Sequence, residues 1–302
     1  MLIYCCKYIQ YSVFIALIAR KLKMKLPTLF ISHGAPTLAL EPGRAGVTFA
    51  AVAKALPTPQ AVLVISAHWE TSGIEVTSHP RPETIHDFGG FPPALYALQY
   101  PAPGAPAVAE RVVALLAAGG FPARANPVRG LDHGAWVPLL HFYPDADVPV
   151  LQLSLPHTAA PQVLVEIGRA LQTLREEGVL IVASGGITHN LYEFRMGASS
   201  EEPYAREFME WFAEHISAGD LPALIDYRRQ APAAARAHPS DEHLRPFYIA
   251  LGAAGATWHR AIRLDGGVDF GVIGMDAYAF GVSDAFSLPI AHMAKEAVNE
   301  QV

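Results

Sequence analysis

The sequence contains few cysteines, and this excludes several kinds of site. Of its 302 residues only Cys5 and Cys6 are cysteine, and adjacent cysteines rarely form a disulfide with each other. A disulfide framework and a cysteine-ligated zinc ribbon are therefore excluded, and so is thiol catalysis in the rest of the chain. This use of cysteine predicts a cytoplasmic protein.

Charged residues are also scarce, at 17% of the chain, compared with roughly 25% in typical soluble domains. The formal net charge of −6 includes no basic excess that would attract a phosphate backbone, so nucleic acid is not an expected partner. The low charge fraction hints at self-association into a homo-oligomer.

The N-terminal 25 residues differ in composition from the rest of the chain. Their apolar stretch, Tyr11–Ala19, has nine residues, too few to span a hydrocarbon core of about 30 Å. The basic residues Arg20 and Lys21 follow this stretch, the reverse of the order in a signal peptide. We therefore interpret residues 1–25 as an extension outside the fold and residues 26–302 as one domain, with no membrane as a partner.

Strand-like and helix-like segments alternate from residue 26 onward. Short apolar runs predict strands at Leu26–Ser32, Ala61–Ser66, Ile74–Ser78, Pro149–Ser154 and Val179–Ala183. Helical spacing predicts helices at Pro106–Ala118, Pro161–Glu177, Tyr204–Ala218 and Leu244–Ala254, and a closing hairpin is expected from residues 257–264 and 268–279. This alternation predicts a single α/β domain with a central mixed, largely parallel sheet flanked by helices.

The common nucleotide-binding, serine-nucleophile and HExxH motifs are absent, whereas histidine is abundant, with 13 residues. Three histidines follow predicted strands: His33 in ISHGAP, His68 in ISAHWE and His189 in SGGITHNL. Ligands of open α/β sheets bind at the carboxyl ends of the strands, so we expect these side chains to converge. His133 in LDHGAW and His243 in SDEHLRPF could reach the same edge. Neutral imidazoles there suit zinc or iron(II).

Other residues near these motifs are candidates for the substrate pocket. Trp69 and Trp136, beside candidate site histidines, could wall an aromatic pocket, and a role in the core is the alternative. His86 in IHDFGGFP is a further candidate, with a surface turn as its alternative. Three aspartates could orient imidazoles as hydrogen-bond acceptors: Asp87, Asp132 and Asp241.

Seven motifs appear in a fixed order: SHGAP, SAHWE, TIHDFGGFPPALYALQYPAPG, LDHGAW, YPDADVPVLQLS, VASGGITHNL and PSDEHLRPF. Together they resemble the class III extradiol ring-cleavage dioxygenases of the 4,5-DOPA dioxygenase type, relatives of the catalytic subunit of protocatechuate 4,5-dioxygenase. The resemblance covers roughly residues 27–281. It implies a single α/β domain that cleaves a catechol-type substrate with O2 to a muconic semialdehyde.

The resemblance also implies roles for the histidines. It assigns a mononuclear iron(II), which zinc can replace, to three ligands: His33, His68 and His243. His189 would be the acid/base, and His133 a second catalytic histidine that contacts substrate or dioxygen. Extradiol enzymes more widely use a carboxylate as the third ligand, so Glu242 is a rival to its neighbour His243.

Two other functions remain open at this point. A zinc-dependent hydrolase would use the same histidines to activate water. A non-enzymatic, metal-binding interaction protein on the same fold is the second alternative. Consumption of oxygen with a catechol would distinguish a dioxygenase from both.

Overall fold

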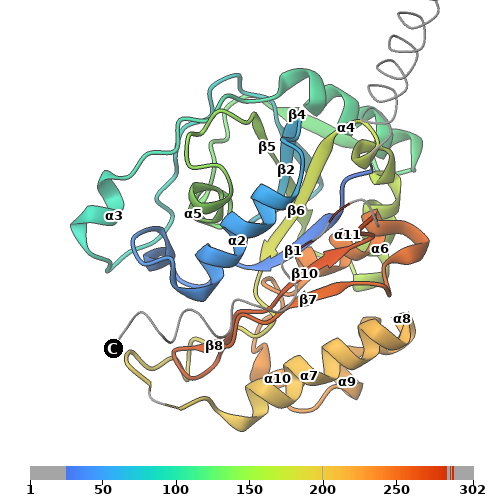
Figure 1. Ribbon diagram of the computed structural model, residues 1–302. Coiled ribbons are helices and arrows are strands. Elements are labelled where there is room, and N and C mark those ends of the chain that lie inside the picture. Colours follow the sequence, from blue (N-terminus) through green and yellow to red (C-terminus); the bar gives the residue numbers. More distant parts are fainter. Residues whose placement is uncertain (1–24, 199, 284–285, 287, 289–302) are drawn as a thin grey trace, which may run out of the picture.

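The computed structural model describes residues 25–198, 200–283, 286 and 288, so most of the expected N-terminal extension, with Cys5 and Cys6, lies outside the described residues. An eight-stranded sheet runs through the molecule in the order β4-β3-β5-β2-β6-β1-β10-β7 (Figure 1). Its strands are β1 (Thr28–Ser32), β2 (Ala61–Thr71), β3 (Ile74–Thr77), β4 (Ala123–Asn126), β5 (Val150–Pro156), β6 (Val179–Gly185), β7 (Ile262–Leu264) and β10 (Ala277–Phe280).

The middle of this sheet is parallel and its outer strands make it mixed. Strands β5, β2, β6 and β1 pair in parallel, as do β3 and β4. The pairs β3–β5, β1–β10 and β10–β7 are antiparallel. All residues of β1 and β6 are buried, as expected for central strands covered on both faces. The predicted α/β domain with a mixed, largely parallel sheet is confirmed.

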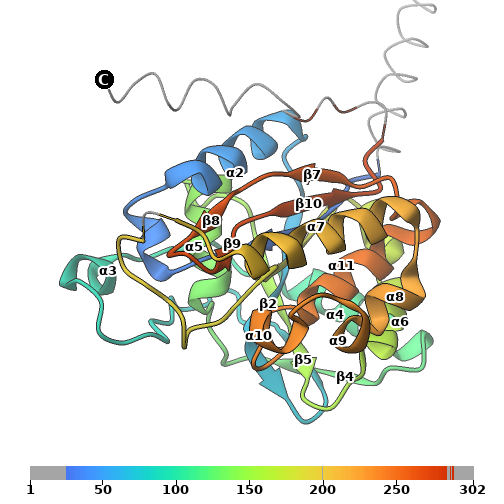
Figure 2. The same ribbon diagram turned by 90° about the horizontal axis from the view of Figure 1, so that it is seen from below.

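Helices cover both faces of the sheet (Figures 1 and 2). Helix α5 (His133–Phe142) packs on β2 and β6 and is covered by α2 (Gly43–Ala55), whereas α11 (Arg245–Ala254) packs on β6 and β1 and is covered by α6 (Pro161–Ala170). The remaining helices are α3 (Pro93–Ala97), α4 (Pro106–Ala118), α7 (Pro203–Ala218), α8 (Leu221–Ile225), α9 (Tyr227–Gln230) and α10 (Ala234–Ala237). Short 3-10 turns lie at Pro36–Ala39, Gln172–Arg175 and Gly255–Thr257.

Several predicted segments have different ends in the structure. Strand β2 continues past Ser66, so His68 lies inside this strand and not after it, and the register with β5 shifts between Ile65 and Glu70. The helix predicted for residues 161–177 is interrupted after α6 and continues as a 3-10 turn. The closing hairpin is formed by β7 and β10, and the segment between them holds a second small sheet of β8 (Val268–Asp269) and β9 (Ile273–Gly274).

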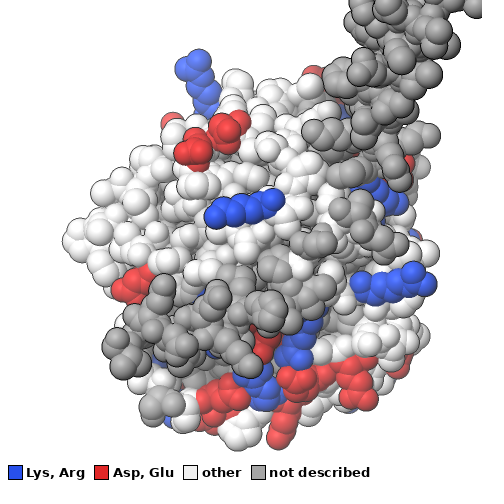
Figure 3. All heavy atoms as spheres, in the orientation of Figure 1, with Lys and Arg blue, Asp and Glu red and all other residues white. Residues whose placement is uncertain are grey.

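The surface carries charges of both signs. On the face shown in Figure 3, acidic and basic side chains are interspersed along the lower edge, where α7 lies in Figure 1. Helix α7 and its neighbours carry ion pairs, among them Arg206–Glu201 and Arg263–Glu210. Within the part of the chain that the structure describes, every helix is too short or too polar to cross a bilayer.

Candidate active site

Five histidines from different parts of the chain meet at the carboxyl ends of the central strands. His33 directly follows β1, and His68 lies near the end of β2. His133 is the first residue of α5, His189 lies in the loop after β6, and His243 lies just before α11. The parallel register of β1, β2 and β6 brings their ends to one edge, which explains why residues so distant in sequence are neighbours.

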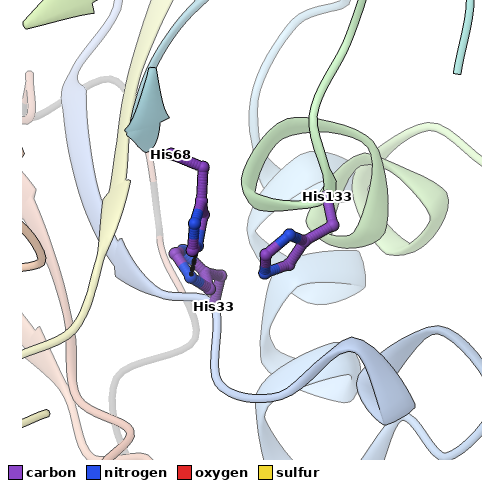
Figure 4. Close-up of side chains that lie close together, drawn as sticks. All are labelled: His33, His68 and His133. Carbon is purple, nitrogen blue, oxygen red and sulfur yellow. Dashed lines mark hydrogen bonds between the residues drawn. The ribbon is translucent and has the colours of Figure 1, made fainter. Parts of the chain in front are cut away.

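The imidazole rings form one contiguous cluster. The ring centres of His33, His68 and His243 lie 4.9–5.3 Å apart, and the Nε2 atoms of His33 and His68 are 3.0 Å apart. His133 points into the same space from α5, with its ring centre 3.9 Å from that of His68 (Figure 4). His189 stacks on His243 at 3.4 Å. The structure thus brings together all five histidines that the sequence selected.

A glycine at the end of β6 allows His243 to approach. A Cβ atom on Gly185 would lie 1.9 Å from the carbonyl oxygen of His243, far inside any allowed contact. The next residue, Gly186, donates its N–H to that same oxygen at 2.9 Å. The two glycines of the SGG segment therefore hold the backbone of His243 directly against the strand end.

The hydrogen bonds of His33 determine which of its nitrogens is free. The Ser184 hydroxyl donates its one proton to the Gly134 carbonyl at 2.5 Å, so it must accept at its 2.9 Å contact with His33 Nδ1. His33 therefore carries its proton on Nδ1, and its Nε2 lone pair faces the cluster. This is the arrangement in which a histidine acts as a metal ligand.

Glu242 fixes the neighbouring histidine in the same way. Its Oε1 lies 2.8 Å from His243 Nδ1, which must be the donor because an ionised carboxylate only accepts. The opposite nitrogen, His243 Nε2, is buried and has no hydrogen-bond partner among the described residues. The same carboxylate oxygen lies 3.7 Å from His189 Nδ1.

Burial favours the neutral form of four of the clustered imidazoles: His33, His68, His189 and His243. Burial lowers the pKa of His33 and His243 well below the usual value, and neighbouring imidazoles lower it further. Burial and the nearby His133 lower the pKa of His68 to about 4. Burial also lowers the pKa of His189, although the Glu242 carboxylate opposes this. Neutral imidazoles at neutral pH have the lone pairs that a metal ion requires.

His133 is held by a carboxylate from another loop. Asp87 Oδ1 lies 3.0 Å from His133 Nδ1 and accepts the backbone N–H of His133 at 2.9 Å. Burial alone would raise the pKa of Asp87, but the hydrogen bond and charge of His133 outweigh it and lower the pKa to about 2. Asp87 therefore orients His133, and not its sequence neighbour His86.

A cavity of about 600 Å³ opens above the histidines. Its floor consists of the five imidazoles and Glu242, and its walls are apolar: Ala35, Pro36, Phe88, Phe91, Leu191 and Phe194. Exposure rises from 2% at His33 on the floor to 63% at Leu191 on the wall. A cavity of this size with largely apolar walls suits a small, mostly apolar ligand.

The three residues predicted to contact substrate lie elsewhere. Trp136 is fully buried in α5 and donates from Nε1 to the Ile85 carbonyl at 2.9 Å. Trp69 is buried beneath the Arg129 guanidinium, and the Nε2 of His86 lies 3.0 Å from the Leu98 carbonyl oxygen. None of the three lines the cavity.

Sequence reasoning missed the residues that do line the walls. Phe88 and Phe91 belong to the same IHDFGGF segment as His86, and in this segment the two phenylalanines line the cavity. Phe194 follows the THNL motif by a few residues and carried no signal of its own. Of the other proposed imidazole partners, Asp132 binds Ser66 and Gln152, and Asp241 accepts backbone N–H groups at the start of α11 through its carbonyl.

A mixed α/β domain with clustered neutral imidazoles beneath an apolar cavity defines a candidate metal-dependent enzyme of small aromatic molecules. Residues 27–269 match the family described as the catalytic LigB subunit of aromatic ring-opening dioxygenase. The chain belongs to this family and is an extradiol ring-cleavage dioxygenase.

Curated relatives and one solved structure cover most of the chain. A 4,5-DOPA dioxygenase extradiol of Escherichia coli K12 is 41% identical over 76% of this chain and 85% of its own length. The enzyme of the same name from Beta vulgaris is 38% identical over 84% of this chain and 96% of its own. The crystal structure of an uncharacterized Escherichia coli K12 protein matches with a TM-score of 0.69 and 31% identity, over 85% of this chain and all of that one.

Proposed function

We propose that the protein uses iron(II), held by His33, His68 and His243, to cleave catechol rings with O2. The observation that carries this assignment is the orientation of the imidazoles. His33 and His243 each have Nδ1 held by an oxygen, so the Nε2 lone pair of each faces the cluster, where His33 Nε2 lies 3.0 Å from His68 Nε2. The Nε2 of His243 is buried and has no hydrogen-bond partner in the described part of the chain, which supports a metal ion as its partner.

The spacing of the rings supports one shared ion. Ligand bonds of about 2.1 Å at tetrahedral angles place imidazole centres about 5 Å apart. The three ring-centre distances of 4.9–5.3 Å agree with this value. The ligand atoms of His33, His68 and His133 lie within 4.8 Å of one another, as do those of His189, Glu242 and His243, so His133 is a rival for the third position. Its ring centre lies only 3.9 Å from that of His68, which is short for two ligands of one ion. Because Glu242 accepts a hydrogen bond from His243 Nδ1, we assign it the role of orienting this ligand and not that of a ligand itself.

The proposed reaction breaks the ring carbon–carbon bond beside the diol and places both oxygen atoms of O2 in the product, a muconic semialdehyde. Relatives named 4,5-DOPA dioxygenase extradiol support a catechol-type substrate. A bound iron(II) would supply the Lewis acid and the redox centre that bring the diol and dioxygen together. Zinc fits the same donor atoms and would lack the redox chemistry.

Two histidines are left to move protons. His189 is neutral at neutral pH and stacks on His243, so its imidazole can accept a proton from a catechol hydroxyl and later return it. Its Nδ1 lies 3.7 Å from Glu242, whose negative charge stabilises the protonated ring. His133, held by Asp87, presents its other nitrogen to the cavity and orients the substrate or dioxygen.

The proposal is tested by metal exchange. Metal-free protein is loaded anaerobically with iron(II) or zinc, metal content is measured, and oxygen uptake is recorded with a panel of catechols. We expect one O2 consumed per catechol and a yellow product with iron, and no uptake with zinc. Absence of uptake across the panel with iron bound would contradict the proposal, and ester hydrolysis by the zinc form would favour a hydrolase.

A further inference from the structure

The cavity walls contain information about the substituent on the catechol ring. Among the residues that line the cavity there is no lysine or arginine, and Glu242 is the one carboxylate. The more exposed part of the lining, where a ring substituent would extend, is apolar, with Phe88, Phe91, Leu191 and Phe194. A negatively charged substituent would lose water there without gaining a partner.

The arginines nearest to the lining in sequence are already paired. Arg195, next to Phe194, donates to Glu202 at 2.6 Å. Arg129 contacts Asp132 at 3.3 Å and lies over the ring of Trp69. Each of these guanidinium groups already has a carboxylate of the protein as its partner, so neither is an uncommitted cation for a substrate carboxylate.

The charge of the metal does not change this conclusion. A divalent ion held by three neutral imidazoles carries two positive charges, and a fully deprotonated diol carries two negative ones. The diol therefore balances the ion, and a proton that the diol passes to His189 is balanced by the neighbouring Glu242 carboxylate, so the floor keeps no net positive charge. An anionic substituent therefore finds no countercharge in the lining, whereas an ammonium group has the Glu242 carboxylate as a possible partner.

We propose that the protein selects catechols whose ring substituent is uncharged or cationic and discriminates against those whose substituent is anionic. This inference rests on the proposed catechol-cleaving function and refines its substrate class. The specificity comes from the absence of a cation in the walls, and a single substitution can supply one. Leu191 is the position for it, because its side chain lines the cavity and is 63% exposed, so a longer polar chain is accommodated.

The test uses three catechols with the same two-carbon linker: 4-(2-hydroxyethyl)catechol, dopamine and 3-(3,4-dihydroxyphenyl)propionate. With the iron-loaded protein, we expect kcat/KM for the carboxylate about tenfold below that of the alcohol, and dopamine equal to or above the alcohol. A ratio of alcohol to carboxylate below threefold would overturn the inference. Equilibrium binding of the same compounds to zinc-loaded protein, measured by calorimetry, should give the same order.

The binding experiment separates the two proposals. If the iron-loaded protein cleaves none of the compounds, the proposed function fails, and the order of the dissociation constants still decides the charge preference. Absence of binding by all three would overturn both. Leu191→Lys should improve the carboxylate about fivefold relative to the alcohol, and the matched Leu191→Gln should not. Equal ratios in these two variants would also count against the inference.

Discussion

The floor and the walls of the cavity are built in different ways. The floor histidines lie in or close to the ends of strands and the starts of helices, and hydrogen bonds to Ser184 and Glu242 orient two of their rings. The Asp87 carboxylate lies 3.0 Å from Nδ1 of a third, His133. The walls come from loops and are held by ring contacts, such as Phe88 with Phe91 at 5.4 Å and Phe194 with Phe270 at 4.4 Å. The floor side chains are thus held by directional hydrogen bonds, whereas the wall side chains are held by the fit of packed rings.

This difference predicts different tolerance to change. A substitution at the floor removes a metal ligand or leaves a buried polar atom without its hydrogen-bond partner. A change of shape in a loop alters which substituent fits while the chemistry continues. Substitutions in the two regions should therefore separate metal binding from substrate preference.

The largest effect is expected from the ligand positions. Alanine at His33, His68 or His243 should reduce bound metal to below one-tenth of the wild-type content and abolish turnover, because two imidazoles hold the ion poorly. His189→Ala should retain metal and lose turnover. Elemental analysis measures the metal content of each variant, and oxygen uptake measures its turnover. His86→Ala, which replaces a histidine outside the cluster, is the matched control.

This experiment also decides between the rival ligand sets. If His243→Ala keeps its metal and Glu242→Ala loses it, Glu242 is the third ligand. If His133→Ala loses metal and His243→Ala does not, the set is His33, His68 and His133, whose ligand atoms lie within 4.8 Å of one another. Either result would refute the assignment made above.

The sequence located the floor far better than the walls. His33 and His189 follow apolar strands, and the parallel sheet brings such positions together wherever the strands pair in that manner. The role of Glu242 and the hydroxyl of Ser184 depend on local rotamers, which no spacing rule supplies. Phe194 lines the cavity because of the conformation of its loop, which the sequence pattern does not reveal. An aromatic residue such as Trp136 is equally suited to the hydrophobic core, where the structure places it.

The free energy of unfolding is expected to depend on pH through His238, which contacts Ile187 in the loop after β6. His238 is fully buried with its Nε2 at 2.9 Å from the Ile187 carbonyl. Burial lowers its pKa from 6.5 to about 4, although the bond to Ile187 opposes this. Between these values the unfolded chain binds the proton and the folded chain does not. The free energy of unfolding should therefore fall as pH drops from about 6.5 to about 4, by at most about 3 kcal/mol from this group.

A variant isolates this contribution from those of the other histidines. His238→Gln keeps an N–H donor for Ile187 but cannot be protonated in this range. Urea unfolding of metal-free protein at pH 7 and pH 4.5 should show a smaller loss of stability in the variant than in the wild type. Parallel losses in the two proteins would show that His238 does not contribute.

The close approach at Gly185 should give the next largest effect. Gly185→Ala forces the backbone of His243 away from β6, since the new Cβ would lie 1.9 Å from its carbonyl oxygen. We expect a loss of stability of about 1–3 kcal/mol and metal binding weakened at least tenfold. Gly186→Ala is the control, because its Cβ would meet nothing closer than 3.3 Å. Unfolding curves and metal titration measure both, and equal metal affinity in the two variants would contradict the assigned role.

The smallest effect is expected at the wall. Phe194→Leu removes an aromatic surface from the cavity while leaving the floor intact, so KM for a catechol should rise by roughly two- to fivefold, equivalent to about 1 kcal/mol, with metal content and kcat unchanged. Phe270→Leu breaks the same ring stack without altering the cavity lining. An equal rise of KM in both variants would assign the effect to loop packing. A fall in metal content in Phe194→Leu would mean that wall and floor are coupled, and the separation drawn between them would not hold.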